Sequence, residues 1–168
     1  MAYELIETIE VGAGGAASIE FTSIPQDGVD LAIKLSSRVA GTFGLTFKFL
    51  TLTFNSDSTG PNYVNRNLRG NGSSTTSQVT SFDGVGATVS SSATSNTFGS
   101  AGIFISNYSS SLNKSYSLDA ISESNSTEAL QSIWAGSYST SSPITSIQIG
   151  SSGDSFVQYS TASLYKIY

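Results

Sequence analysis

Apolar and polar residues alternate along much of this chain, which is the pattern of β-strands that bury one face. The alternation is interrupted by turn sequences such as Pro25-Gln26-Asp27-Gly28, where Pro and Gly fix the backbone angles. The segments that show it are residues 17–22, 30–35, 103–105, 116–120, 133–137, 145–149 and 156–168. The pattern therefore predicts an all-β protein.

The longest apolar run covers residues 42–55. Its apolar side chains occupy odd positions as far as Phe49 and even positions from Leu50 onward. One extra residue in a strand moves every later side chain to the opposite face, so this change predicts a β-bulge at Phe49-Leu50. A hairpin is the competing interpretation, but no turn residues interrupt the run.

Two other segments lack a clear pattern. Residues 55–100 are rich in Ser, Thr, Gly and Asn, and we predict a long excursion with short strands that forms contacts. Residues 124–133 fit either a strand or a short helix that begins near Ser126 and Glu128. Both alternatives are open for that segment.

About eight to eleven short strands with turn signals about every 8 to 12 residues are typical of an antiparallel β-sandwich, and we expect one of the jelly-roll type. At 168 residues, the chain is expected to form one domain, residues 1–168, with a core that needs no disulfide or metal. No apolar stretch approaches the ~20 residues that span a bilayer. The Glu-rich N-terminus does not fit a signal peptide, so we expect no membrane role.

The chain contains neither histidine nor cysteine. The usual general base near neutral pH, the commonest metal ligand and every thiolate nucleophile are therefore missing. We expect a protein that is not an enzyme and holds no cofactor or metal.

Charge and surface chemistry point to protein partners. The net charge is −5, and the seven basic residues are spread along the chain, so we expect no nucleic-acid binding. Only 11% of residues are charged, whereas roughly three in ten are Ser or Thr. Such a neutral, hydroxyl-rich surface suits packing against other protein subunits.

Two polar clusters could carry chemistry. Residues 55–60 match the opening of a calcium-binding loop, but the twelfth position is Arg66 instead of the usual Glu, and a polar turn is the alternative. The carboxylates of Asp119, Glu123 and Glu128 could supply a glycosidase pair. Glu128 could equally lie in the first turn of a helix.

Four aromatic residues are the candidate binding residues: Tyr63, Tyr108, Trp134 and Tyr138. Aromatic rings on a neutral surface could stack on sugar rings and form a carbohydrate-binding face. The alternative is that these rings fill the core or a subunit interface, where aromatic residues are enriched.

Several segments resemble small virion proteins of tailed bacteriophages, notably those of marine bacteria. The likeness is carried by YELIETIEV and the Gly-rich segment after it (residues 3–25), by residues 107–108 and 113–117, and by FVQYSTASLY (residues 156–165). It covers most of the chain and thins over residues 40–55 and 75–100.

The resemblance implies a virion structural protein that assembles in the host cytoplasm. We expect a trimeric decoration (cement) protein whose residues 55–100 and N-terminal segment contact the major capsid protein or neighbouring copies. The alternative is a head or tail fibre module that binds a host receptor or glycan.

Overall fold

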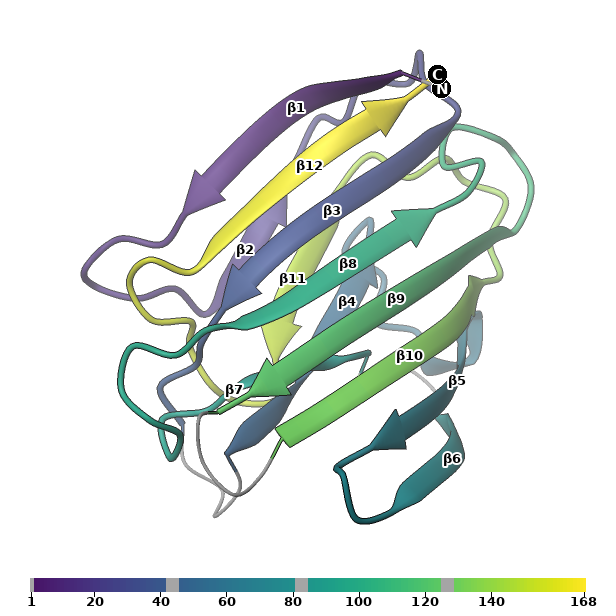
Figure 1. Cartoon of the computed structure of the whole chain (residues 1–168). Coiled ribbons are helices and arrows are strands. Elements are labelled where there is room, and N and C mark those ends of the chain that lie inside the picture. The colour runs from purple at the N-terminus through teal and green to yellow at the C-terminus, as the bar shows by residue number, and fades with distance from the viewer. Residues whose placement is uncertain (1, 42–45, 81–84, 125–128) are drawn as a thin grey trace.

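The computed structural model describes residues 2–41, 46–80, 85–124 and 129–168, and in these ranges it contains twelve β-strands and one short 3-10 helix (Figure 1). The elements are β1 (Tyr3–Glu10), β2 (Ser18–Phe21), β3 (Asp30–Ser37), β4 (Phe47–Phe54), η1 (Gly60–Asn62), β5 (Tyr63–Gly70), β6 (Thr75–Thr80), β7 (Ala87–Val89), β8 (Gly99–Ile105), β9 (Lys114–Glu123), β10 (Ala129–Tyr138), β11 (Ile147–Ser151) and β12 (Thr161–Ile167). Among these residues no helix has the length and apolar character needed to cross a membrane.

The strands form two antiparallel sheets that pack face to face (Figure 1). The large sheet has the order β1-β12-β3-β8-β9-β10-β5-β6, and the small sheet has the order β2-β11-β4-β7. A cluster of buried apolar side chains from both sheets lies between them. The structure confirms the predicted all-β antiparallel sandwich. A jelly roll is a narrower class, with eight strands in two Greek keys, and that part of the expectation stays a prediction.

Two segments differ from their predicted form. The helical alternative for residues 124–133 is wrong from Ala129 onward, because Ala129–Tyr138 is the strand β10; residues 125–128 lie outside the described residues. The last strand is also shorter than residues 156–168, since β12 begins at Thr161. Tyr159 has a φ of +70°, a left-handed conformation that a strand does not contain.

The β-bulge predicted at Phe49-Leu50 is not in β4 itself but in the neighbouring segment, at Val85 and Gly86, which pairs with Leu50. β4 pairs with β11 without a register shift. On its other side, the Leu50 N–H donates to the Gly86 oxygen (3.2 Å) and the Leu50 oxygen accepts from the Val85 N–H (2.8 Å), so two residues face one. Gly86 has a φ of +84°, which favours glycine at a bulge.

A buried arginine organises the loop between β7 and β8. The Arg38 guanidinium donates to the backbone oxygens of Thr94 (2.8 Å), Thr97 (3.0 Å), Ser91 (3.3 Å) and Ala93 (3.0 Å). Burial lowers the pKa of Arg38. One side chain therefore holds four carbonyls of the same loop in place.

Two lysines have similar anchoring roles. The buried Lys114 ammonium donates to the backbone oxygens of Thr140 (3.4 Å) and Ser142 (2.5 Å) in the loop after β10. Lys166 on β12 is also buried and donates to both carboxylate oxygens of Asp27 (2.9 and 3.0 Å). The hydrogen bond with Asp27 is the main cause that raises the pKa of Lys166. These cations hold loops against the sandwich instead of forming a basic surface.

Candidate functional site

The outer face of the large sheet carries a group of exposed aliphatic side chains. On β5, β9 and β10 the residues alternate strictly between buried and exposed over most of each strand. Five exposed aliphatic residues fall on these strands and on β6, with exposed fractions between 37% and 67%: Val64, Leu68, Val79, Ile121 and Ile133. We call these five residues the aliphatic face.

Strand register places the aliphatic face on neighbouring strands. Ile133 on β10 lies between Leu68 on β5 and Asp119 on β9. Val79 on the edge strand β6 lies directly across from Arg66 on β5. Directly opposed residues in antiparallel strands have side chains on the same face and in contact range. Leu68 and Ile133 are therefore neighbours, and Val64, Val79 and Ile121 lie on the same face of the sheet, opposite polar residues.

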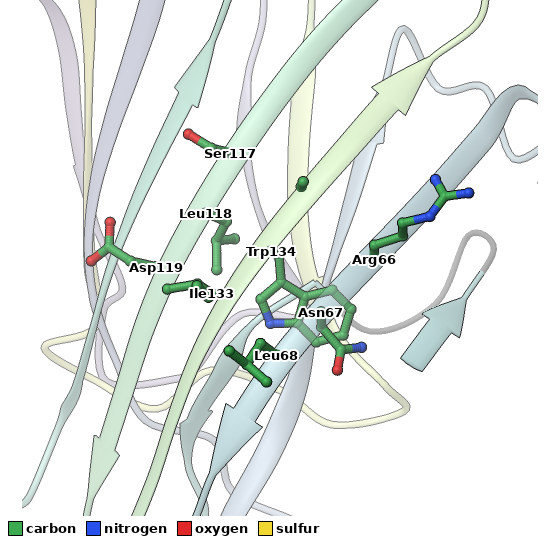
Figure 2. Close-up of a pocket in the computed structure, with 9 residues that line it drawn as sticks. Arg66, Asn67, Leu68, Ser117, Leu118, Asp119, Ile133 and Trp134 are labelled. Carbon is green, nitrogen blue, oxygen red and sulfur yellow. The ribbon is translucent and has the colours of Figure 1, made fainter. Parts of the chain in front are cut away.

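A shallow hollow of about 490 Å³ lies within this surface (Figure 2). It is lined by Arg66, Asn67, Leu68, Ser117, Leu118, Asp119, Ile133, Trp134 and Ala135. The small side chains of Ser117 and Ala135 leave the space free, and Figure 2 shows Arg66 and Asp119 on opposite sides of it. A neighbouring hollow of about 320 Å³ shares Leu68 and Ile133.

This surface combines the apolar side chains of Leu68 and Ile133 with the charged Arg66 and Asp119 and the hydroxyl of Ser117 around them. Deep, enclosed pockets bind small molecules, whereas these hollows lie open on a sheet face. Among the described residues no group of three or more Asp or Glu could hold a metal ion.

The four candidate aromatic residues all lie inside the sandwich, with exposed fractions between 0% and 4%. Tyr63 and Tyr138 pack together with ring centroids 4.8 Å apart. Trp134 packs edge-on against Phe49. Tyr108 lies elsewhere, where its hydroxyl donates to the backbone of the loop before β3. The structure therefore brings two of the four together and favours the core alternative for all four.

A buried hydrogen bond joins β5 and β9 on the inner face, across the intervening strand β10. The Tyr116 hydroxyl donates to the Asn65 side-chain oxygen (2.6 Å), and burial raises the pKa of Tyr116 to about 12. Gly136 lies opposite both residues in the register. A Cβ at Gly136 would lie 2.2 Å from the Tyr116 ring, so this packing requires glycine.

Residues 55–60 form a structural turn. The Asn55 side-chain oxygen accepts from the backbone N–H groups of Thr145 (2.8 Å) and Ser146 (3.2 Å). The Asp57 carboxylate accepts from the Thr59 backbone N–H (2.8 Å) and the Asn62 amide (2.7 Å). These oxygens, which a calcium ion would need, are bonded to the protein itself, which favours the polar-turn alternative.

The turn predicts a pH dependence of stability. Hydrogen bonds from Thr59, then Asn62 and Tyr138, lower the pKa of Asp57 from 3.8 to about 2. A lowered pKa in the folded state stabilises the fold above the unfolded-state pKa, and this contribution is lost as pH falls through the folded-state pKa. We expect the free energy of unfolding to fall between about pH 4 and pH 2 by more in the wild type than in Asp57→Asn.

Urea denaturation at several pH values between 5 and 2 measures this difference. Because the other carboxylates are common to both proteins, subtracting the two curves isolates Asp57. Parallel curves over the whole range would contradict a role for this carboxylate.

Asp119 and Glu123 do not form the carboxylate pair that a glycosidase would need. Asp119 and Glu123 are both exposed on β9, four residues apart, which corresponds to roughly 13 Å along a strand. A glycosidase pair stands at most ~9.5 Å apart. Glu128 lies outside the described residues.

The sequence interpretation missed the aliphatic face. It placed Ile133 and Ala135 in the alternating pattern of a strand without deciding which side faces the core. The signal was present, because Trp134 and Tyr138 share the opposite parity and the larger aromatic rings take the core side, which leaves Ile133 outside.

No protein-family model, curated protein or solved structure matches this chain. The described residues form an all-β sandwich with exposed aliphatic side chains on the outer face of its large sheet.

Proposed function

We propose that this protein is a structural component of a bacteriophage virion, and that it attaches to the shell of the major capsid protein as a decoration protein. The aliphatic face is the observation that carries the proposal. Exposed apolar side chains grouped on adjacent strands of a rigid sheet are typical of surfaces that pack against other proteins. The low charge of the chain, 11% of residues, also suits close packing between subunits.

The aliphatic face is large enough to contribute substantially to attachment. Burying one half-exposed Leu, Ile or Val side chain contributes about 1 kcal/mol, so the five residues together supply roughly 5 kcal/mol. A micromolar affinity corresponds to about 8 kcal/mol. Arg66 and Asp119 beside the hollow would fix the orientation of the partner. Three of the five residues belong to the segment 55–100 that was expected to form contacts.

We further propose that the protein attaches as a homotrimer, which is one of the closed, symmetric assemblies that homo-oligomers form. It would enter the particle during assembly in the host cytoplasm.

Attachment is tested by placing a charge in the aliphatic face. Ile133→Asp and Leu68→Asp should each reduce the number of copies per purified particle at least tenfold, because the docked surface would bury an unpaired carboxylate. Leu112→Asp is the matched control, since Leu112 is also exposed but lies outside the face. Quantitative mass spectrometry against the major capsid protein measures the copy number. Equal occupancy of all three variants would overturn the role of the face.

The location in the particle tests the proposed function itself. Cryo-electron microscopy of particles should show hundreds of copies on the shell lattice. A few copies at the tail or at one vertex would overturn decoration and favour a fibre. Absence from particles would overturn both.

The fibre alternative has a specific observation in its favour at another place. Tyr3 and Tyr165 lie on β1 and β12 with ring centroids 6.5 Å apart, and Tyr3 is 58% exposed. Exposed tyrosines can stack on sugars. Binding to host glycans that is lost in Tyr3→Ala would support this second function.

A further inference from the structure

The two edge strands of the large sheet, β1 and β6, differ in how well they are protected against pairing with a strand of another chain. Edge strands expose unpaired backbone groups, and proteins protect them with charges, prolines or bulges. β1, at one edge, carries Glu4, Glu7 and Glu10, and its register with β12 shifts between Leu5 and Glu7. This edge therefore has two of the usual protections.

β6, at the other edge, has none of them. Its sequence TTSQVT contains no charge and no proline. It pairs with β5 without a shift, from Thr75 opposite Gly70 to Thr80 opposite Asn65. Figure 1 shows β6 as the last strand of the large sheet, below β5. A regular, neutral edge of this kind is a template for another strand.

The hairpin geometry indicates which backbone groups are open. The Asn71 N–H donates to the Ser74 oxygen (3.2 Å) across the turn. Hydrogen-bonded and non-hydrogen-bonded pairs alternate in an antiparallel ladder, so the N–H and C=O groups of Thr75, Ser77 and Val79 point away from β5. All three residues are exposed.

We propose that β6 pairs antiparallel with β6 of a second copy, about a two-fold axis at Ser77. In this register Ser77 lies opposite Ser77 of the other copy, and Thr75 lies opposite Val79. All the open groups of the three residues then find partners, which gives about six hydrogen bonds. In a register centred on Gln78, only two of the three residues with open backbone groups, Ser77 and Val79, would lie opposite each other, and Thr75 would have no partner within β6.

A second copy fits this edge because the strand is complementary to itself. The register brings no charged residue opposite another, and a two-fold axis perpendicular to the sheet keeps both outer faces on the same side. The aliphatic faces of the two copies would then form one surface.

The pairing does not depend on the proposed virion role, and it can add to a trimer contact elsewhere. A contact of six residues per copy is below the ~1,200 Å² of a stable interface, so the association is expected to be weak in solution.

Single cysteines test the register, because the chain has no cysteine of its own. Residues opposed in a hydrogen-bonded pair have Cα atoms ~5.5 Å apart, within the range of ~4.4–6.8 Å that a disulfide allows. Under mild oxidation, Ser77→Cys should form disulfide-linked dimers at least tenfold faster than Gln78→Cys or Thr8→Cys. Gln78 would lie opposite Thr76 of the other copy, and Thr8 is exposed on the protected edge strand β1. Equal rates for the three variants would overturn the proposal.

A charge on the edge provides the second test. Ser77→Lys should raise the dissociation constant of the dimer, measured by sedimentation at several protein concentrations, at least tenfold, because it places two cations opposite each other. Ser115→Lys, an exposed serine on β9, should leave it unchanged. Circular dichroism checks that both variants are folded. An association that is the same in wild type and Ser77→Lys would contradict β6 pairing.

Discussion

Replacing Arg38 with alanine is expected to lower the free energy of unfolding by about 3 to 5 kcal/mol, because it leaves four loop carbonyls without their donor. Four hydrogen bonds to a charged group, at about 1.5 to 3 kcal/mol each, would add up to a larger loss. The expected loss is smaller because part of the loop can turn its carbonyl groups toward water. In a domain of this size the loss corresponds to roughly 6 to 20 °C in melting temperature. Thermal unfolding followed by circular dichroism measures it.

The variant Arg38→Lys tests whether the loop is stabilised by the positive charge of Arg38 or by the shape of its guanidinium group. A lysine keeps the positive charge, but its single ammonium cannot reach four carbonyls as the guanidinium fork does, so most of the loss should remain. Arg66→Ala is the control, because Arg66 is exposed on β5 and should change stability by less than about 0.5 kcal/mol. If Arg38→Ala matched Arg66→Ala, the loop would not depend on its guanidinium.

The second large effect is expected for Gly136→Ala. The added methyl group would lie 2.2 Å from the Tyr116 ring and 2.6 Å from the Asn65 side-chain oxygen, so the ring must move away from its buried hydrogen bond. Overpacking of this kind costs about 1 to 3 kcal/mol, and the broken hydrogen bond adds about 1 kcal/mol. We expect a total loss of about 2 to 4 kcal/mol in urea denaturation.

Spectroscopy gives the same variant an independent readout. Displacing the Tyr116 ring toward water should lower the pKa of this phenol from about 12 toward its ordinary value of 10.0, which absorbance titration detects. Gly12→Ala is the matched control, since a Cβ at Gly12 meets no atom within 4 Å. A wild-type titration curve in Gly136→Ala would show that the ring had not moved.

Period-two alternation was sufficient to identify most of the sandwich. In β9 the predicted core residues Tyr116, Leu118 and Ala120 are all buried, because a strand exposed to water on one side enforces the pattern. The polar turn considered for residues 55–60 is also present. The Asp57 side chain accepts a hydrogen bond within this turn, and the Asn55 side chain accepts hydrogen bonds from the segment before β11. The fold class therefore follows from local rules.

Features that depend on partner strands were not predictable in this way. Asn65 on β5 faces the core, where its side chain accepts a hydrogen bond from Tyr116, far along the chain; a buried polar side chain needs such partners, and the pattern within β5 does not reveal them. Because the odd-numbered residues of β5 through Asn67 face the core, Leu68 lies on the outer face although it is apolar. The candidate surface therefore arises from strands whose parity is set by long-range contacts.

The two ends of the described chain meet at one corner of the sandwich. Tyr3 pairs with Ile167, and the Tyr168 N–H donates to the Ala2 oxygen (3.2 Å) (Figure 1). This corner belongs to the β1 edge, and five strands of the large sheet lie between β12 and the far edge strand β6. A reporter or cargo domain joined to either end would therefore leave from the same point, away from β6 and the aliphatic face, and two different cargoes could be carried side by side.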